Sequence, residues 1–179
     1  MEILGTYTQT EIGHGSDIAG LRTTATFDAK TQEFIINTPD ELATKWWPGD
    51  VGLFATHTVV FAVLVLEENP VGVMPFIVQI RDLKTAMPMP GCKMGDMGPK
   101  LGWNSKSNGY ASFDNVRIPR DQMLMRFVSV DEEGTFSIEG DTRILYAVMM
   151  NIRMQLIDHS GIALSKALTI GIRYSAVRR

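Results

Sequence analysis

Residues 7–17, with the sequence YTQTEIGHGSD, hold the densest group of side chains that could bind a ligand. The first four are aromatic, hydroxyl and amide residues that suit a strand and can form hydrogen bonds. Gly13 and Gly15 follow, and the backbone at a glycine can approach a ligand closely because there is no Cβ. An ordinary glycine turn closed by Ser16 or Asp17 explains the same residues, so the stretch alone leaves both interpretations open.

The histidines do not indicate an acid–base or metal site. His14 lies between two glycines, where we expect it to be exposed and not to be a catalytic base. His57 and His159 lie in apolar stretches, where a structural histidine is the more common finding. No histidine pair or carboxylate cluster has the spacing of a metal site, so none is predicted. A dinucleotide fingerprint is absent too, since the third glycine and the βαβ setting are missing.

Composition argues against several other classes of function. The formal net charge is −3 with 21% charged residues, which provides no polybasic surface for nucleic acid. Cys92 is the only cysteine, so an internal disulfide and a thiolate cluster are excluded and a buried small side chain is expected. The longest apolar run, residues 58–66, is too short to span a bilayer and predicts a buried strand. The first residues do not resemble a signal peptide, so we do not expect secretion.

The elements that must position the candidate residues are mostly short strands. Alternating apolar and polar residues predict strands at 23–27, 33–37, 56–66, 71–80 and 109–114. The first two should form a hairpin around a polar connection, and the next two a second pair joined by a turn with Asn69 and Pro70. Together they predict a compact antiparallel β-barrel or sandwich over residues 1–128.

Residues 85–108 interrupt these strands and are dense in proline, glycine and methionine. A loop of this length inside a compact domain is uncommon unless it binds something. The segment is therefore either a wall of a ligand site or an extended connection, with some strand in its later part.

A long helix is predicted from Asp141 onward, after a polar linker at residues 129–140. Asp141 is a suitable N-cap, and apolar residues then occupy most of the helix circumference. Such a helix must be buried on most sides, yet the chain offers no second helix to cover it. We therefore expect residues 141–179 to be one helix of an α-helical bundle in a larger protein.

Four motifs, in the same order as in the family, resemble the signatures of the peroxisomal acyl-CoA oxidases. They are TEIGHGS at 10–16, INTP at 36–39, ATKWWPG at 43–49, and FDNVRIPR at 113–120 with MLMR at 123–126. The resemblance covers nearly the whole chain. It implies the middle β domain of such an enzyme followed by the first helix of its C-terminal helical domain, and hence a fragment.

The resemblance implies an FAD-dependent activity. An acyl-CoA oxidase removes the pro-R hydrogens from the α and β carbons of a fatty acyl-CoA and passes the electrons through FAD to oxygen. The products are trans-2-enoyl-CoA and hydrogen peroxide. The family also implies a homodimer and a peroxisomal location, although residues 177–179 do not form the small-basic-leucine peroxisomal address.

The resemblance also assigns roles to individual residues. Thr10 and Gly49 take the positions that contact the flavin. Ser16 takes the position of a serine near the pantetheine or phosphate arm of the substrate, with closure of the glycine turn as the alternative role. No catalytic residue is predicted in this chain, because the family's base is a glutamate that would lie beyond Arg179. Glu11 should point to the strand face opposite Thr10.

Three details of this assignment remain open. Trp47 is either a neighbour of the flavin or, more commonly before a Pro-Gly turn, a core anchor. An acyl-CoA dehydrogenase with another electron acceptor is the alternative enzyme, although the WWPG and HGS motifs favour the oxidase. A non-catalytic β domain that serves as a binding module is the alternative of a different class.

Overall fold

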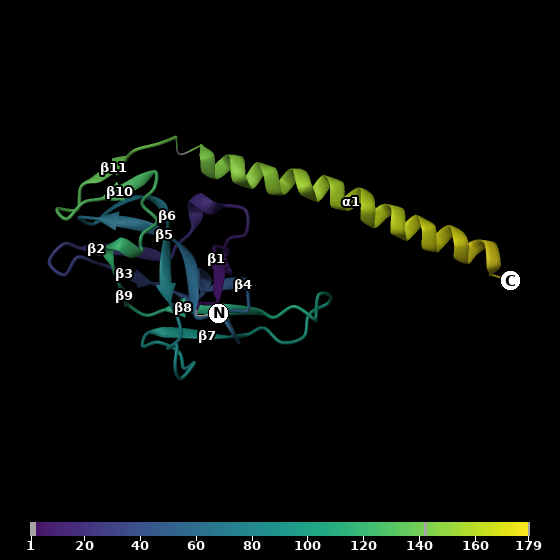
Figure 1. The fold of residues 1–179 in the computed structure, drawn as a ribbon, viewed down its shortest axis with the longest axis horizontal. Coiled ribbons are helices and arrows are strands. Elements are labelled where there is room, and N and C mark those ends of the chain that lie inside the picture. The colour runs from purple at the N-terminus through teal and green to yellow at the C-terminus, as the bar shows by residue number, and fades with distance from the viewer. Residues whose placement is uncertain (1–2, 142, 179) are drawn as a thin grey trace. The chain divides into compact units, whose positions relative to one another are not determined.

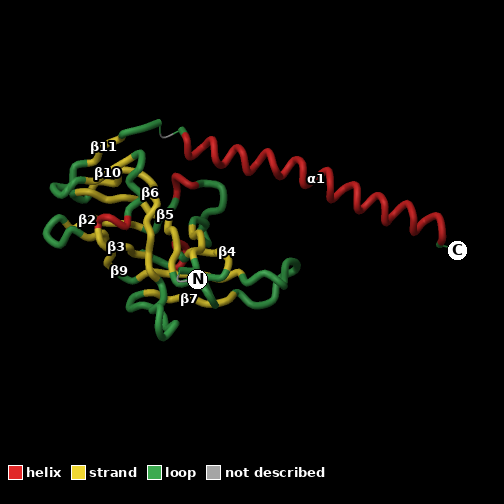
Figure 2. Tube along the Cα trace, in the orientation of Figure 1, coloured by secondary structure: helices red, strands yellow, loops and turns green. Residues whose placement is uncertain are grey.

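The computed structural model describes residues 3–141 and 143–178. The chain divides into two compact units, Met1–Ser137 and Ile138–Arg179. The first unit is built of strands and short 3-10 turns, and the second is dominated by one long helix (Figure 1 and Figure 2). The predicted fold class, mainly β with a single C-terminal helix, is confirmed.

The largest sheet is organised on a central strand, β5. In the described residues it contains β1 (Gly5–Thr8), β2 (Thr24–Asp28), β3 (Glu33–Asn37), β5 (His57–Leu66), β6 (Asn69–Gln79) and β9 (Val116–Pro119). β6 pairs with β5 along its whole length, while β1 and β2 pair with successive halves of β5. The two predicted hairpins, β2 with β3 and β5 with β6, are both confirmed.

Two strand pairs differ from the antiparallel arrangement that we expected. β1 and β2 both run parallel to β5. Each connection to β5 is long enough for the chain to return, which parallel pairing requires. Apolar–polar alternation is the same for either direction of pairing, so the sequence pattern could not distinguish them.

A second, antiparallel sheet has the order β4 (Lys45–Gly49), β8 (Asn108–Phe113) and β7 (Cys92–Asp96). β7 lies inside the long predicted loop, and residues 97–107 after it contain no strand. The register of β4 against β8 shifts between Trp46 and Gly49, which marks a bulge. Bulges re-aim side chains, and here the bulge contains Trp47.

Both sheets contribute to one hydrophobic core. The ring of Phe34 lies 5.2 Å from that of Phe27 and 5.1 Å from that of Phe76, centroid to centroid. From the second sheet, Phe113 and Cys92 are buried in the same cluster. Burial raises the pKa of the Cys92 thiol to about 11, as expected for a cysteine that acts as a small apolar side chain.

The stretch that we expected to be a linker contains a small hairpin. It is formed by β10 (Val128–Val130) and β11 (Phe136–Ile138). The guanidinium of Arg120 donates a hydrogen bond to the carbonyl of Val130 at 2.8 Å. Strands of three residues are too short to give a readable alternation, so the sequence showed only the polar turn.

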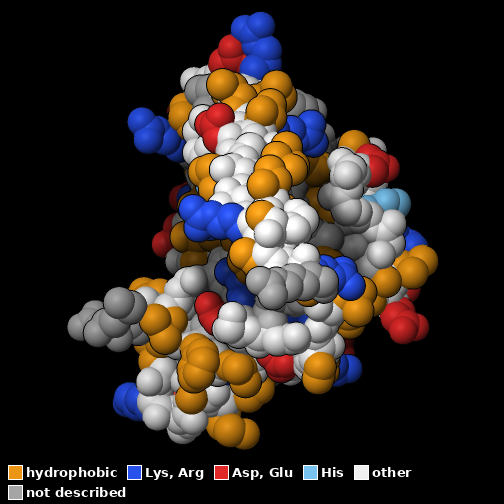
Figure 3. All heavy atoms as spheres, turned by 90° about the vertical axis from the view of Figure 1, so that its right-hand side faces the viewer, with side chains coloured by type: hydrophobic (Ala, Val, Ile, Leu, Met, Phe, Trp, Pro, Cys, Tyr) orange, Lys and Arg blue, Asp and Glu red, His pale blue; other side chains and the backbone are white. Residues whose placement is uncertain are grey.

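The helix α1 (Ile144–Val177) has Arg143, not the predicted Asp141, at its N-cap. The Asp141 carboxylate instead accepts hydrogen bonds from the backbone and side chain of Arg143. Large apolar side chains of α1 are exposed at adjacent positions, with Leu156 at 61% and Ile157 at 71%. Exposed hydrophobic side chains are visible over the face shown in Figure 3. Among the described residues, no helix combines the length and apolar character that a membrane crossing requires.

Truncation of the core should destabilise the chain strongly. Phe34→Ala removes a fully buried ring between two others, and we expect the free energy of unfolding to fall by about 3–5 kcal/mol. Leu101→Ala, at a fully exposed side chain, should change it by less than about 0.5 kcal/mol. Urea denaturation of the 179-residue chain measures both. Equal effects of the two substitutions would contradict the assignment of Phe34 to the core.

Candidate functional site

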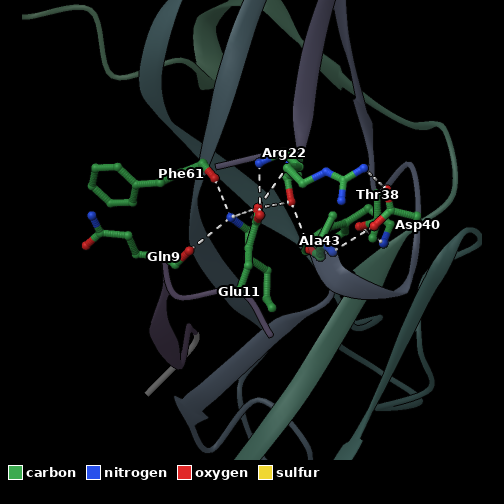
Figure 4. A network of polar contacts seen from close by, with 10 residues as sticks. Gln9, Glu11, Arg22, Thr38, Asp40, Ala43 and Phe61 are labelled. Atoms are coloured by element: carbon green, nitrogen blue, oxygen red, sulfur yellow. Dashed lines mark hydrogen bonds and ion pairs between the residues drawn. The ribbon is translucent and has the colours of Figure 1, made fainter. Parts of the chain in front are cut away.

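A buried ion pair joins the candidate stretch to β4. The Lys45 ammonium is 2.9 Å from Oε1 of Glu11, and neither side chain is exposed to solvent. The ammonium also donates hydrogen bonds to the carbonyls of Gln9 at 3.1 Å and Phe61 at 2.6 Å, as Figure 4 shows. Three acceptors match the three protons of a charged lysine. Lys45 therefore links residues 9–11 to β4 and β5.

The carboxylate of Glu11 has further donors. Its oxygens accept hydrogen bonds from the backbone N–H groups of Arg22 and Thr23, at 2.9 and 3.0 Å, and from the Thr23 hydroxyl at 2.6 Å. Burial alone would raise the pKa of Glu11, but the Lys45 charge and these hydrogen bonds outweigh it and hold the pKa below its usual value. Burial lowers the pKa of Lys45, and the Glu11 charge opposes that effect.

Thr10 is held between these buried contacts. β1 ends at Thr8, and Glu11 forms isolated bridges with His14 and Lys45 rather than belonging to a named strand. The carbonyl of Thr10 accepts a hydrogen bond from the N–H of Trp46 at 2.9 Å. Within the described part of the chain, the Thr10 hydroxyl forms no hydrogen bond. The side chain of Thr10 is therefore available to a ligand, whereas that of Glu11 is not.

Gly49 ends β4 on the other side of the bulge. Its carbonyl accepts a hydrogen bond from the hydroxyl of Thr6 in β1. A Cβ at this position would lie 3.3 Å from Cε of Lys106, the far part of a flexible side chain. The fold thus requires only a small adjustment of Lys106 if Gly49 gains a side chain.

The two adjacent tryptophans have different environments. Trp46 is half-buried and stacks on Tyr110, with ring centroids 5.9 Å apart and an interplanar angle of 23°. Trp47 has φ +79° and is 51% exposed. The expectation that Trp47 anchors the core is therefore wrong, because the bulge turns its ring outward.

A surface hollow of about 600 Å³ begins at Trp47. It is lined by Trp47, Met97, Pro99, Lys100, Leu101, Gly102, Trp103, Lys106 and Asn108. Most of these residues come from the loop after β7, which supports the interpretation of this loop as a ligand wall. Two aromatic rings, two ammonium groups and apolar side chains can receive a flat ring system that carries negative charge.

The turn after Gly49 is fixed by a second buried cation, Arg81. Its guanidinium donates to the carbonyls of Val51 and Ala55, both at 2.8 Å, and of Gly52 at 2.9 Å. Neither Arg81 nor Lys45 was predicted to be buried. The residues of β4 carry no signal for Lys45, because their burial does not alternate along the strand.

The glycine turn is closed by backbone hydrogen bonds between Glu11 and His14, and Ser16 and Asp17 do not close it. Asp17 instead caps the 3-10 turn at Ile18–Gly20 that follows. Asp17 accepts a hydrogen bond from the N–H of Gly20, and the Ser16 side chain is exposed with no hydrogen bond within the described residues. At Gly15 neither the backbone φ nor any atom within 4 Å requires a glycine. The surface at Gly15 and Ser16 is therefore open to a ligand.

The histidines hold structural or surface positions. His14 is partly buried rather than exposed as predicted. Its ring lies close to Gly20, where an added Cβ would be 3.3 Å from Cε1 of the histidine. His57 is partly buried in β5 beside the Thr56 hydroxyl, and burial lowers its pKa. His159 is exposed on α1. No group of three metal-ligating side chains occurs in residues 3–141 and 143–178.

Comparisons with known proteins converge on one family. The acyl-CoA dehydrogenase middle domain matches residues 6–116, and the acyl-CoA oxidase C-alpha1 domain matches residues 146–179. Peroxisomal acyl-coenzyme A oxidase 1 of Rattus norvegicus is 46% identical over the whole chain. The chain spans about 27% of the length of that relative.

Solved structures agree with these matches. Acyl-CoA oxidase 1 of Arabidopsis thaliana is similar over 100% of this chain and 28% of its own, with a TM-score of 0.95 and 48% identity. Acyl-CoA oxidase-2 of Caenorhabditis elegans, solved with FAD, ascaroside-CoA and ATP, has a TM-score of 0.91 and 45% identity. The similarity covers 99% of this chain and 27% of that one.

The buried pair should make stability depend on pH. Because the pKa of Glu11 is lower in the folded chain, the unfolded chain takes up the proton first as the pH falls. The contribution of Glu11 should be complete above its unfolded pKa, about 4.5, and be lost as the pH falls further. Urea denaturation between pH 7 and 3 measures the change.

Glu11→Gln combined with Lys45→Met is the matched control, because neither new side chain titrates and the glutamine oxygen can still accept from Thr23. The N–H of Arg22, which donates to the other carboxylate oxygen, loses its acceptor. The stability of the double variant should fall less steeply below pH 4.5. An identical pH profile in the two chains would show that Glu11 contributes nothing to acid sensitivity.

Proposed function

We propose that this chain forms part of an FAD-dependent acyl-CoA oxidase. The chain belongs to the acyl-CoA dehydrogenase family, in its acyl-CoA oxidase branch. The complete enzyme would convert a fatty acyl-CoA to the trans-2-enoyl-CoA and reduce oxygen to hydrogen peroxide. The observation that carries the proposal is the outward ring of Trp47, which lies at the bulge between Trp46 and Gly49 and lines the hollow.

The residues around this bulge fit the isoalloxazine of FAD. A flavin site needs a flat wall and hydrogen-bonding groups at the ring edge. Trp47 offers an exposed aromatic face, Thr10 a hydroxyl without a partner among the described residues, and Gly49 a position without a side chain. The ammonium group of Lys106 is near Gly49, as a Cβ there would be 3.5 Å from it. These features are those of a site for a planar, electron-accepting ring beside an electron-rich indole.

The chain's own residues have distinct roles in this proposal. FAD, when bound, would supply the redox chemistry, which is acceptance of a hydride and transfer of electrons to oxygen. Trp47 and the loop after β7 exclude water from one side of the ring, and Thr10 holds its edge. Ser16, exposed beside the open surface at Gly15, would bind the pantetheine or phosphate arm of acyl-CoA.

We assign no catalytic base to this chain. Removal of the α-proton of a thioester needs a carboxylate within hydrogen-bond reach of that proton. Glu11 is the acidic residue next to Thr10, but its carboxylate is buried and occupied by Lys45, Arg22 and Thr23. The catalytic base and the peroxisomal address would be supplied by parts of the enzyme outside these residues. The complete enzyme would pair with a second copy of itself as a homodimer. The peroxisomal location rests on the names of the relatives.

The proposal predicts that a side chain at Gly49 removes the flavin. The test protein is a chimera in which these 179 residues replace the matching segment of Arabidopsis thaliana acyl-CoA oxidase 1, which is 48% identical. Gly49→Val should lower the flavin absorbance per subunit, because a branched side chain would occupy the place of the ring. An unchanged absorbance in the purified variant would refute the assignment of Gly49.

Thr10→Ala provides a graded comparison in the same chimera. Loss of one hydrogen bond should weaken FAD binding by about 1 kcal/mol, or roughly fivefold. Lys106→Met leaves Gly49 and Thr10 in place and removes the ammonium group beside Gly49. Its FAD affinity shows how much that charge contributes to binding. If the unaltered chimera binds no FAD and oxidises no palmitoyl-CoA, the function reduces to that of a non-catalytic β domain.

The 179-residue chain by itself should not oxidise acyl-CoA. The carboxylate next to Thr10, that of Glu11, is already engaged by Lys45, and we expect the family's catalytic glutamate to lie outside these residues. With palmitoyl-CoA and added FAD, a peroxidase-coupled assay should detect no hydrogen peroxide above the blank. We also expect weak FAD binding and a tendency to aggregate, since apolar side chains of α1 are exposed. Peroxide production that Glu11→Gln abolishes would instead make Glu11 the base.

A further inference from the structure

We propose that Glu11 and Lys45 are positioning residues, which hold Thr10 and the bulge at Trp47 in one fixed arrangement for the ligand. The identity of the ligand, a flavin, rests on the proposed function above. The arrangement itself rests only on contacts among residues of this chain. Neither residue would touch the flavin, because both side chains are fully buried.

Thr10 lies between two neighbours that are both bound to Lys45. The Lys45 ammonium binds the carbonyl of Gln9, the residue before Thr10, and the carboxylate of Glu11, the residue after it. Rotation of the backbone at Thr10 would break at least one of these bonds. The short stretch that carries the free hydroxyl is thus held from both sides by one cation.

β4 connects Lys45 directly to the bulge. The N–H of Trp46 donates to the carbonyl of Thr10, so Thr10 and β4 are joined immediately before the strand departs from its regular register. Beyond the bulge, Asn108 donates to the carbonyl of Trp47 at 2.7 Å. Lys45 fixes the near end of the bulge, and contacts such as that of Asn108 fix its far end.

The chemical character of the pair also favours a positioning role. Two buried charges lose their hydration, and replacing such a pair by apolar residues is often neutral or stabilising. Packing alone therefore does not require Glu11 and Lys45. What an ion pair adds is direction, since Glu11 and Lys45 each bind three or more groups at set angles. The apolar face of a methionine would bind none of them.

The experiment separates positioning from stability. The variant Glu11→Gln with Lys45→Met removes both charges and keeps one acceptor oxygen, which can serve Thr23 but not Arg22 as well. In the 179-residue chain, amide exchange at Trp46 should become at least about tenfold faster, because its bond to Thr10 loses its support. Amides between β3 and β9 should be unchanged, and Ile118→Ala, a core truncation in β9, serves as the destabilised control.

Binding of FAD is measured in the chimera with the Arabidopsis thaliana enzyme. The double variant should bind FAD at least about tenfold more weakly even when its melting temperature equals that of Ile118→Ala, which should keep its affinity within about twofold. Affinity that follows melting temperature in both variants, with Trp46 still protected, would overturn the proposal. If the unaltered chimera binds no FAD, the proposed function fails, and amide exchange alone decides the positioning role.

A milder substitution covers the case in which the double variant does not fold. Thr23→Val preserves the shape of the side chain and removes only the hydroxyl that donates to Glu11 at 2.6 Å. Exchange at Trp46 should then rise about threefold, and FAD affinity in the chimera should fall to a similar extent. No change in either quantity would contradict a positioning role for Glu11.

Discussion

The buried pair of Lys45 and Glu11 is the constraint on which the arrangement of the first unit depends. It connects the end of the first strand region, the start of β2, β4 and the central strand β5, and these segments are distant in the sequence. A single buried charge would be costly, and each of the two is retained only because the other is present. The pair therefore specifies that these segments meet in one register.

Sequence periodicity was sufficient for the elements whose stability comes from one apolar face. The β5–β6 pair and the helix α1 were predicted because alternation and helical spacing reflect burial directly. Strand direction was not predictable, since β1 and β2 would show the same alternation in either orientation against β5. The hairpin of β10 and β11 was missed because three residues are too few to show a period.

The candidate site was predictable only in part, for a related reason. Thr10, Gly49 and Ser16 were assigned from motifs, and their contacts with ligands remain proposals. The outward position of Trp47 could not be read from the sequence, because a bulge shifts the register of β4 without a specific sequence signal. Lys45 and Arg81 were missed because a lysine or arginine is usually assumed to be exposed. Their partners are mainly backbone carbonyls, which no side-chain pattern reveals.

The two units also differ in the source of their stability. The first unit buries a hydrophobic core to which both of its sheets contribute, and its buried cations are satisfied within it. In contrast, α1 exposes leucine and isoleucine side chains at adjacent positions, so more than one face of the helix lacks a covering surface. A helix in a protein gains most of its stability from tertiary packing. Substitutions in the β unit should therefore act on the proposed flavin site through contacts within that unit, to which Thr10, Gly49 and Trp47 all belong.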